Sequence, residues 1–206
     1  MIIGVTGFQG DVEEHVKASR IAGERIGVDC RVIVVKDRSD LKDVDGLIIP
    51  GGESTVMGKL AVYRDVMSEI KERIESGLPV MGTCAGLILL AKRVYDRVVG
   101  ETRQPLIGTL DITVERNTYG RQRESFESWI EVRRLSIDRF RAVFIRAPAI
   151  VEVGGDVEVL ATLGTRPVAV LEGGTIGTSF HPELTSDTKF HELLLNIAKG
   201  RPEGCF

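Results

Sequence analysis

The chain has 206 residues, 43% of them hydrophobic, which is enough for one α/β domain with its own core. Its 27 basic and 30 acidic residues give a formal net charge of −3, which argues against a strongly basic nucleic-acid-binding protein and a polybasic membrane anchor. Three cysteines without a CxxC pair argue against a disulfide scaffold and a cysteine-based zinc site. Without a signal peptide or a long apolar run, we also expect a cytoplasmic protein that binds neither nucleic acid nor membrane.

Short apolar runs alternate with helical patterns over the first 93 residues. The apolar runs predict strands over residues 2–5, 31–35, 46–49 and 78–81. Helices are predicted over residues 11–26, 55–75 and 85–93. Asp11 and Glu14 have the spacing of a capping box at the start of the first helix. This alternation predicts a parallel sheet that is covered by helices on both faces.

After residue 93 the pattern changes to short β segments separated by glycines or charged turns. These segments are predicted at residues 106–116, 128–135, 142–153, 157–163, 167–171 and 175–180. A last helix is expected at residues 187–199. The mixed pattern predicts an α/β fold, with antiparallel strands added to a mostly parallel central sheet. We expect residues 1–200 to form a single domain, followed by a C-terminal tail at 201–206.

The strongest local signal is the sequence Gly-Thr-Cys-Ala-Gly at residues 82–86, between a predicted strand and a predicted helix. Flanking glycines let a chain turn sharply, so that a nucleophile at Cys84 projects from the carboxyl end of the sheet. The start of the next helix favours negative charge and offers backbone N–H donors to an oxyanion. A small buried cysteine beside closely packed glycines remains an equally good interpretation of these residues alone.

A base for such a nucleophile has to come from one of three histidines. His15 and His191 lie in predicted helices among charged neighbours, so we expect surface or capping positions for both. His181 instead ends a predicted strand in the sequence His-Pro-Glu. Residues two apart in an extended segment point the same way, so the carboxylate of Glu183 is placed to orient the imidazole. The alternative is a His-Pro turn with a solvated glutamate.

A third signal is the sequence Pro-Gly-Gly-Glu-Ser-Thr at residues 50–55, again where a predicted strand ends and a helix begins. Paired glycines there allow backbone N–H groups to face a ligand. Ligand sites of open α/β sheets collect outside the carboxyl ends of the strands. Three such signals at three strand ends are hard to attribute to turn chemistry alone.

Two other patterns favour different functions. Glycines at positions 4, 7 and 10 with Asp37 after the second strand resemble a dehydrogenase nucleotide fingerprint, but no Tyr-x-x-x-Lys pair accompanies them. A cluster of arginines suits phosphate, although acidic neighbours make a solvated loop just as good an interpretation. Its members are Arg116, Arg121 and Arg123.

Six segments together resemble the class I glutamine amidotransferases, and more closely the glutaminase subunits of pyridoxal 5′-phosphate synthases. The matching segments are GDVEEH, PGGEST, GTCAGLILLA, ERNTYGRQ, IRAP and FHPEL. They span nearly the whole chain, and their order and spacing are highly specific. One departure is VTGFQG at residues 5–10, where the family more often has a small apolar stretch before Gln-Gly. The resemblance implies a flavodoxin-like three-layer sandwich.

The resemblance also implies a Cys–His–Glu triad that needs no metal and no organic cofactor. Cys84 attacks the side-chain amide of L-glutamine, His181 moves protons and Glu183 orients His181. Backbone N–H groups of Gly52 and Ala85 hold the oxyanion. The remaining substrate-binding residues that the resemblance implies are Gly51, Glu53, Ser54, Arg116, Ile145 and Arg146.

In the resembled family the acceptor of the ammonia is a separate synthase with a (β/α)8 barrel, so we expect a hetero-oligomer. We further expect the chain alone to be a poor glutaminase, because the Gly51–Gly52 turn needs a partner to set the oxyanion hole. Two alternatives are a stand-alone cysteine hydrolase of the same broad fold and a binding module without catalytic activity. The first does not require glutamine specificity, and both predict that a glutamine-analogue electrophile does not label Cys84 stoichiometrically.

Overall fold

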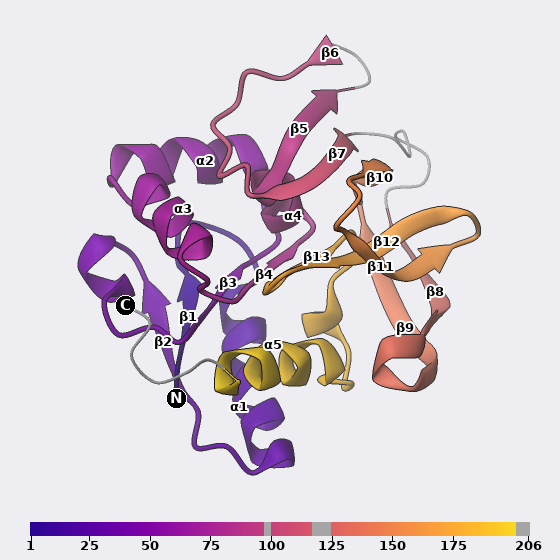
Figure 1. The fold of residues 1–206 in the computed structure, drawn as a ribbon, viewed down its shortest axis with the longest axis horizontal. Coiled ribbons are helices and arrows are strands. Elements are labelled where there is room, and N and C mark those ends of the chain that lie inside the picture. The colour runs from indigo at the N-terminus through magenta and orange to yellow at the C-terminus, as the bar shows by residue number, and fades with distance from the viewer. Residues whose placement is uncertain (97–99, 117–124, 201–206) are drawn as a thin grey trace.

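A seven-stranded sheet forms the middle layer of the fold (Figure 1). The structure is a computed structural model that describes residues 1–96, 100–116 and 125–200. The sheet runs in the order β11-β12-β13-β4-β3-β1-β2. In that order the strands are Glu158–Leu163, Arg166–Glu172, Thr175–Thr178, Val80–Thr83, Gly46–Ile49, Ile2–Thr6 and Arg31–Val35. The five strands from β13 to β2 are parallel, whereas β12 and β11 are added antiparallel, as the sequence predicts.

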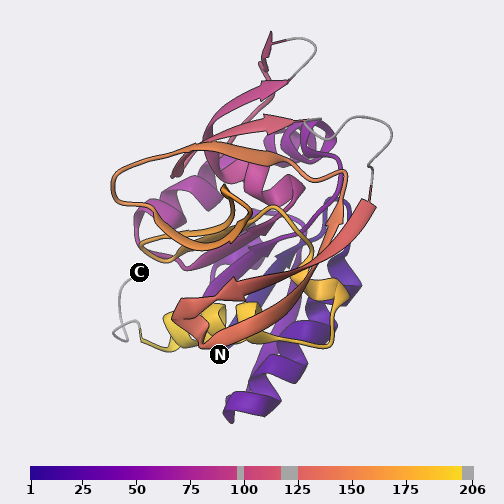
Figure 2. The same cartoon turned by 90° about the vertical axis from the view of Figure 1, so that its right-hand side faces the viewer.

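Helices cover both faces of this sheet (Figures 1 and 2). They are α1 (Val12–Ile26), α2 (Ser54–Tyr63), α3 (Met67–Glu75), α4 (Ala85–Leu90) and α5 (Lys189–Lys199). The helices α1 and α5 pack side by side on one face, and α2, α3 and α4 lie on the other. Each face has its own apolar cluster, and most of the side chains in these clusters are buried. Short 3-10 turns are found at Arg38–Leu41, Arg133–Leu135 and Pro182–Leu184.

The remaining strands form two smaller sheets beside the central layer. One has the order β10-β7-β5-β6, and the other is the hairpin of β8 and β9. Their bounds are Ala91–Asp96 (β5), Gly100–Glu101 (β6), Leu110–Arg116 (β7), Ser125–Val132 (β8), Ile137–Ile145 (β9) and Ala149–Val153 (β10). The sandwich of helices, parallel sheet and helices confirms the expected fold class.

Three of the predicted elements were wrong in detail. The helix expected at 55–75 is two helices, because the chain turns at Asp65, whose φ is 54°. The helix expected at 85–93 ends at Leu90, and residues 91–96 instead form β5, which pairs with β7. The strand expected at 142–153 is interrupted between β9 and β10, where Arg146 has a φ of 44°. In each case a tertiary contact or a single left-handed residue overrides the local pattern.

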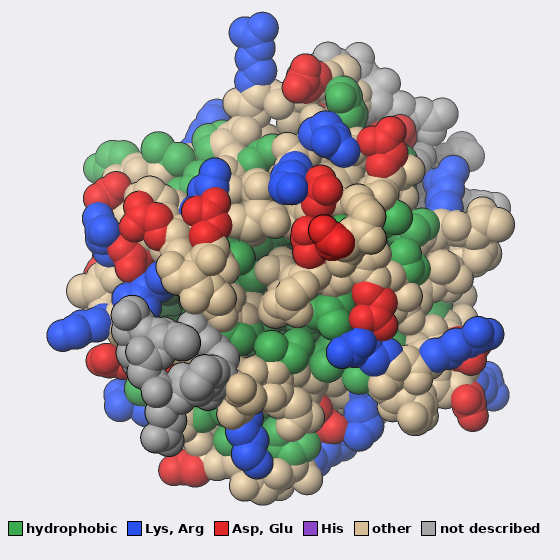
Figure 3. All heavy atoms as spheres, in the orientation of Figure 1, with side chains coloured by type: hydrophobic (Ala, Val, Ile, Leu, Met, Phe, Trp, Pro, Cys, Tyr) green, Lys and Arg blue, Asp and Glu red, His purple; other side chains and the backbone are tan. Residues whose placement is uncertain are grey.

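The surface of the molecule carries charges of both signs. On the face in Figure 3, basic and acidic side chains are interspersed, in agreement with the small net charge. Among the described residues, none of the helices has the length and apolar character that crossing a membrane requires. The tail expected at 201–206 and the arginines at 121 and 123 lie outside the described residues.

Candidate active site

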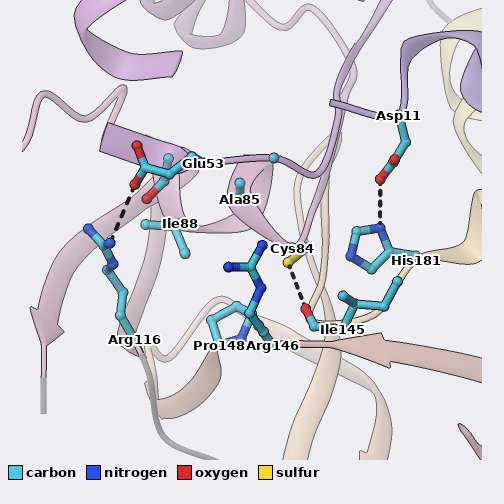
Figure 4. Close-up of a pocket in the computed structure, with 12 residues that line it drawn as sticks. Asp11, Glu53, Cys84, Ala85, Ile88, Arg116, Ile145, Arg146, Pro148 and His181 are labelled. Atoms are coloured by element: carbon cyan, nitrogen blue, oxygen red, sulfur yellow. Dashed lines mark hydrogen bonds and ion pairs between the residues drawn. The ribbon is translucent and has the colours of Figure 1, made fainter. Parts of the chain in front are cut away.

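A pocket of about 270 Å³ opens at the carboxyl ends of the parallel strands (Figure 4). Four neighbouring strands, β13, β4, β3 and β1, end beside it, which is where open α/β sheets place their ligands. The residues that line it are Asp11, Gly52, Glu53, Ser54, Cys84, Ala85, Ile88, Arg116, Ile145, Arg146, Pro148 and His181. All three signals from the sequence therefore meet at one place.

Cys84 sits on a sharp turn between β4 and α4. Its φ of 49° and ψ of −100° lie outside the regions that ordinary residues adopt, so the backbone is strained where the thiol is presented. The two flanking glycines make this turn possible. A Cβ at Gly86 would lie 2.0 Å from the carbonyl oxygen of Ile49, and one at Gly82 would lie 2.7 Å from the carbonyl carbon of Gly86.

The thiol of Cys84 is nearly buried but borders the pocket. The side chain is 7% exposed, and its Sγ lies 3.8 Å from the carbonyl oxygen of Ile145 at the end of β9. Figure 4 shows the sulfur between Arg146 and the ring of His181. The two interpretations of this segment are therefore compatible. The glycines pack closely, and the same turn presents the Cys84 thiol to the pocket.

His181 follows β13 and is held through one ring nitrogen. Its Nδ1 lies 2.7 Å from Oε1 of Glu183 and 3.1 Å from Oδ2 of Asp11. The other ring nitrogen makes no hydrogen bond within the described part of the chain, and in Figure 4 it faces Cys84. Burial disfavours the charged ring, but the contacts of Nδ1 with Asp11 and Glu183 and the nearby thiol of Cys84 outweigh it and raise the pKa of His181 far above its usual range. This environment stabilises an imidazolium beside the thiol.

Glu183 lies behind His181 and is itself buried. It belongs to the 3-10 turn Pro182–Leu184 and not to the extended segment that the sequence predicted, yet its carboxylate still reaches the ring. Burial raises the pKa of a carboxyl group, yet the neighbouring His15 and His181 more than offset this and hold the pKa of Glu183 well below its usual range. The carboxylate is therefore ionised. This is the geometry in which an acidic group orients an imidazole and stabilises its positive charge.

Asp11 is a pocket residue that the sequence predicted in a different role. It precedes α1 as expected, but its side chain makes no capping hydrogen bond, so the predicted capping box is wrong. The carboxylate points to His181 instead. Donor atoms of Asp11, His181 and Glu183 lie within 4.8 Å of one another, a spacing that also suits a metal ion. Because Nδ1 already contacts both carboxylates, hydrogen bonding accounts for the cluster.

The far wall of the pocket carries a second set of charges. Glu53 caps α2, with its carboxylate accepting hydrogen bonds from the backbone N–H groups of Thr55 at 3.2 Å and Val56 at 2.7 Å. Although burial opposes it, these bonds lower the pKa of Glu53. Arg116 Nη2 lies 3.5 Å from Glu53 Oε1. Arg146 is exposed and makes no ion pair with a described residue, so its guanidinium is available to an anion.

The structure places nearly all predicted site residues around this one pocket. Gly51 does not line it but packs against His181, since a Cβ there would lie 2.4 Å from Cε1 of the ring. Sequence reasoning missed Asp11, Ile88 and Pro148 as lining residues. Pro148 is the last residue of IRAP, one of the segments that resemble the family, and this match was the signal by which it could have been found.

Both remaining histidines lie elsewhere than predicted. His15 and His191 are completely buried, whereas surface or capping positions were expected. Beside His15, Glu13 and Glu14 are exposed, as the sequence suggested. Next to His191, however, Glu192 is buried together with the ring. The burial of a single histidine cannot be read from the pattern of apolar residues in its helix. For this reason the sequence did not predict the buried positions of these two rings.

The glycines of the dehydrogenase-like pattern have a packing role. A Cβ at Gly4 would lie 2.8 Å from Val35, and one at Gly7 would lie 2.4 Å from Val34. Gly10 has a φ of 99°, and a Cβ there would lie 1.6 Å from the carbonyl oxygen of Gly51. The pattern is therefore explained by close approach of β1 and its following loop to β2 and to the 51–52 turn.

Comparison with known proteins decides between the remaining interpretations. Residues 5–199 match the model of the SNO glutamine amidotransferase family. The chain belongs to this family. A chain described as the pyridoxal 5′-phosphate synthase subunit PdxT of Nitrosopumilus maritimus is 48% identical over 96% of both chains. PdxT of Sulfurisphaera tokodaii is 47% identical over 97% of this chain and all of its own.

Solved structures agree with this membership. A glutamine amidotransferase crystal structure superimposes with a TM-score of 0.85 at 44% identity, covering 97% of this chain and all of that one. Another glutamine amidotransferase, from Thermotoga maritima, has a TM-score of 0.63 at 15% identity and so supports the fold alone. Family membership confirms that the protein is an enzyme, a glutamine amidotransferase, and that its fold is flavodoxin-like.

Proposed function

We propose that the protein is the glutaminase subunit of a pyridoxal 5′-phosphate synthase. It hydrolyses L-glutamine to L-glutamate and ammonia through a thioester on Cys84 and passes the ammonia to a partner synthase. The observation that carries the chemistry is the strained Cys84 turn facing a His181 ring that is held by Glu183. The observation that favours this partner is the name of relatives that are 47–48% identical over nearly the full length.

The reaction proceeds in two halves. In the first, the Cys84 sulfur attacks the side-chain amide carbonyl of glutamine, and the thiol proton passes through His181 to the leaving nitrogen, which departs as ammonia. In the second, His181 takes a proton from water, which attacks the γ-glutamyl thioester and releases glutamate and the thiol. Backbone N–H groups of Gly52 and Ala85 on the pocket wall are assigned to the oxyanion of both tetrahedral intermediates.

The charges of the pocket suit the zwitterionic end of an amino acid. The exposed guanidinium of Arg146 matches the α-carboxylate. The carboxylate of Glu53 matches the α-ammonium group, with Arg116 and the Thr55 and Val56 N–H groups keeping it in place. Gly51, Ser54 and Ile145 complete the site, which we assign to a single domain over residues 1–200.

Ammonia gives a physical reason for a partner. In bulk water it becomes protonated and diffuses away, so direct transfer to a docked synthase retains the nucleophile. We assign the partner to the class of (β/α)8-barrel synthases. A reducing compartment keeps a reactive thiol such as Cys84 from oxidation, which supports a cytoplasmic location.

The test is glutamate release from glutamine by the chain alone and in complex with its synthase. We expect slow release by the chain alone and stimulation of at least about 10-fold by the synthase, because partner binding completes the site. Asparagine, one methylene shorter, should be hydrolysed poorly by both. Absence of glutamate release in the complex would refute the proposal. Equal rates with and without the synthase would favour a stand-alone hydrolase instead.

A glycine that contacts the histidine offers a separate prediction. In Gly51→Ala the new Cβ meets the His181 ring and Oδ2 of Asp11, at 2.4 Å and 3.1 Å, so the imidazole has to move. Misplacement of a catalytic group by about 1 Å costs up to about 100-fold. We expect kcat of the complex to fall about 10- to 100-fold with little change in melting temperature. Wild-type kcat in this variant would contradict the assigned position of His181.

A further inference from the structure

Behind Glu183 lie two buried histidines to which the reaction assigns no role. His15 comes from α1 and His191 from α5, and both are 0% exposed. His15 Nε2 lies 3.4 Å from Oε2 of Glu183, and its Nδ1 lies 3.0 Å from Nε2 of His191. A line of interacting groups therefore runs from Cys84 into the core between the two helices.

Hydrogen-bond accounting indicates what His15 does for Glu183. One carboxylate oxygen, Oε1, is bound to His181, so the other, Oε2, needs its own donor or positive charge in this buried place. The described residues offer Oε2 no hydrogen bond, and the group that faces it is the His15 Nε2. The same nitrogen lies 3.1 Å from Oγ1 of Thr83, the residue before Cys84. His15 thus connects the glutamate to the strand that carries the nucleophile.

We propose that His15, supported by His191, is a positioning residue that keeps Glu183 ionised and fixed against His181. This inference rests on the proposed function, because it assigns His15 a part in the same glutamine hydrolysis. It acts through Glu183 and does not touch substrate. The interacting side chains then form a row that begins at the pocket and ends in the core, in the order Cys84, His181, Glu183, His15 and His191.

Protonation states around the glutamate fit this arrangement. Burial lowers the pKa of His191 to about 3, aided by His15 and opposed by Glu183, so His191 is neutral. The titratable groups that face Glu183 are His181 from the β13 side and His15 from α1. His191 on α5 stands behind His15, and Asp11 shares the Nδ1 of His181. Among these groups, His15 is the one whose removal takes away the ring nitrogen that faces Oε2 of Glu183 while leaving His181 intact.

A purely structural role predicts a different outcome. If the two rings only filled space between α1 and α5, apolar side chains of similar volume would replace them at little cost, since buried polar groups are seldom retained for stability alone. If His15 maintains the charge of Glu183, its loss raises the pKa of that carboxyl. Glu183 then becomes protonated at a higher pH than in the wild type, so on acidification the variant loses activity at a higher pH than the wild type does.

The experiment measures kcat and KM for glutamine against pH in the complex with the synthase. For His15→Leu we expect kcat to fall about 10- to 100-fold, the usual cost of losing a group that orients a catalytic side chain, with KM changing less than about twofold. The acid limb of the profile should move up by about one pH unit or more. In His15→Gln the amide N–H reaches the position of Nε2. This variant should therefore retain most of the wild-type kcat, and its acid limb should lie close to the wild-type pH.

Two further variants cover the case in which His15→Leu does not fold. His15→Asn is polar and retains reach toward His191 but not toward Glu183, so it should shift the acid limb as leucine does. His191→Leu leaves the donor to Glu183 in place and should give a smaller shift in the same direction. A wild-type acid limb in His15→Asn, or in His15→Leu, overturns the inference. The proposed function fails separately, if the wild-type complex releases no glutamate.

Discussion

Replacing Cys84 with alanine is expected to reduce glutamine hydrolysis by the complex at least about 1,000-fold, because no thioester can form without the sulfur. The alanine variant should fold normally, since it loses one small group that is 7% exposed at the edge of a pocket. Synthesis by the partner from added ammonia should continue at the wild-type rate. The measurement is glutamate release, run in parallel with product formation from glutamine and from an ammonium salt.

Cys30 offers a matched control for this loss. It is the other free cysteine among the described residues, is partly exposed, and lies beyond the end of α1, away from the pocket. Burial raises the pKa of its thiol, which makes it a poor nucleophile. A glutamine-analogue electrophile should label the wild type and Cys30→Ala with one equivalent each, and Cys84→Ala with none. More than a tenth of the wild-type rate in Cys84→Ala would refute the covalent mechanism.

Much of this site could be predicted from the sequence because its signals are local. The turn at Cys84 and the turn at 51–52 both follow short apolar strands, and parallel strands deliver such turns to the same edge of a sheet. The pairing of His181 with Glu183 was predicted from their spacing of two residues in an extended segment. The two side chains do meet, but Glu183 lies in the 3-10 turn Pro182–Leu184, so the residues were predicted correctly and the backbone that brings them together was not. Each inference needs only neighbours in the chain and the rule that orders parallel strands.

The groups that escaped prediction depend on contacts between distant segments. Asp11 has the sequence signature of a helix cap, yet it contacts a residue 170 positions later in the chain. His15 and His191 are 176 positions apart and meet because α1 packs on α5. Residues 91–96 have a helical neighbourhood and become a strand by pairing with β7. Local pattern carries no information about such partners, and tertiary packing overrides it.

A single methyl group at Gly86 is expected to destabilise the protein by about 3 kcal/mol, near the upper end of ordinary overpacking costs. In Gly86→Ala the new Cβ lies 2.0 Å from the carbonyl oxygen and 2.8 Å from the carbonyl carbon of Ile49, which are backbone atoms of β3. The start of α4 therefore has to move away from the sheet. For a protein of this size the melting temperature should fall by about 6–12 °C, measured by calorimetry.

The sign of this effect tests the packing at the turn. Alanine is favoured over glycine within a helix by about 1 kcal/mol, so without the contact to Ile49 the substitution would stabilise α4. Gly155→Ala is the control, because that glycine is exposed, has no atom within 4 Å of its Cβ position and should change stability by less than about 0.5 kcal/mol. A higher melting temperature in Gly86→Ala would show that α4 stands further from β3 than described. The strained presentation of Cys84 depends on that same contact, so the variant should lose glutaminase activity along with stability.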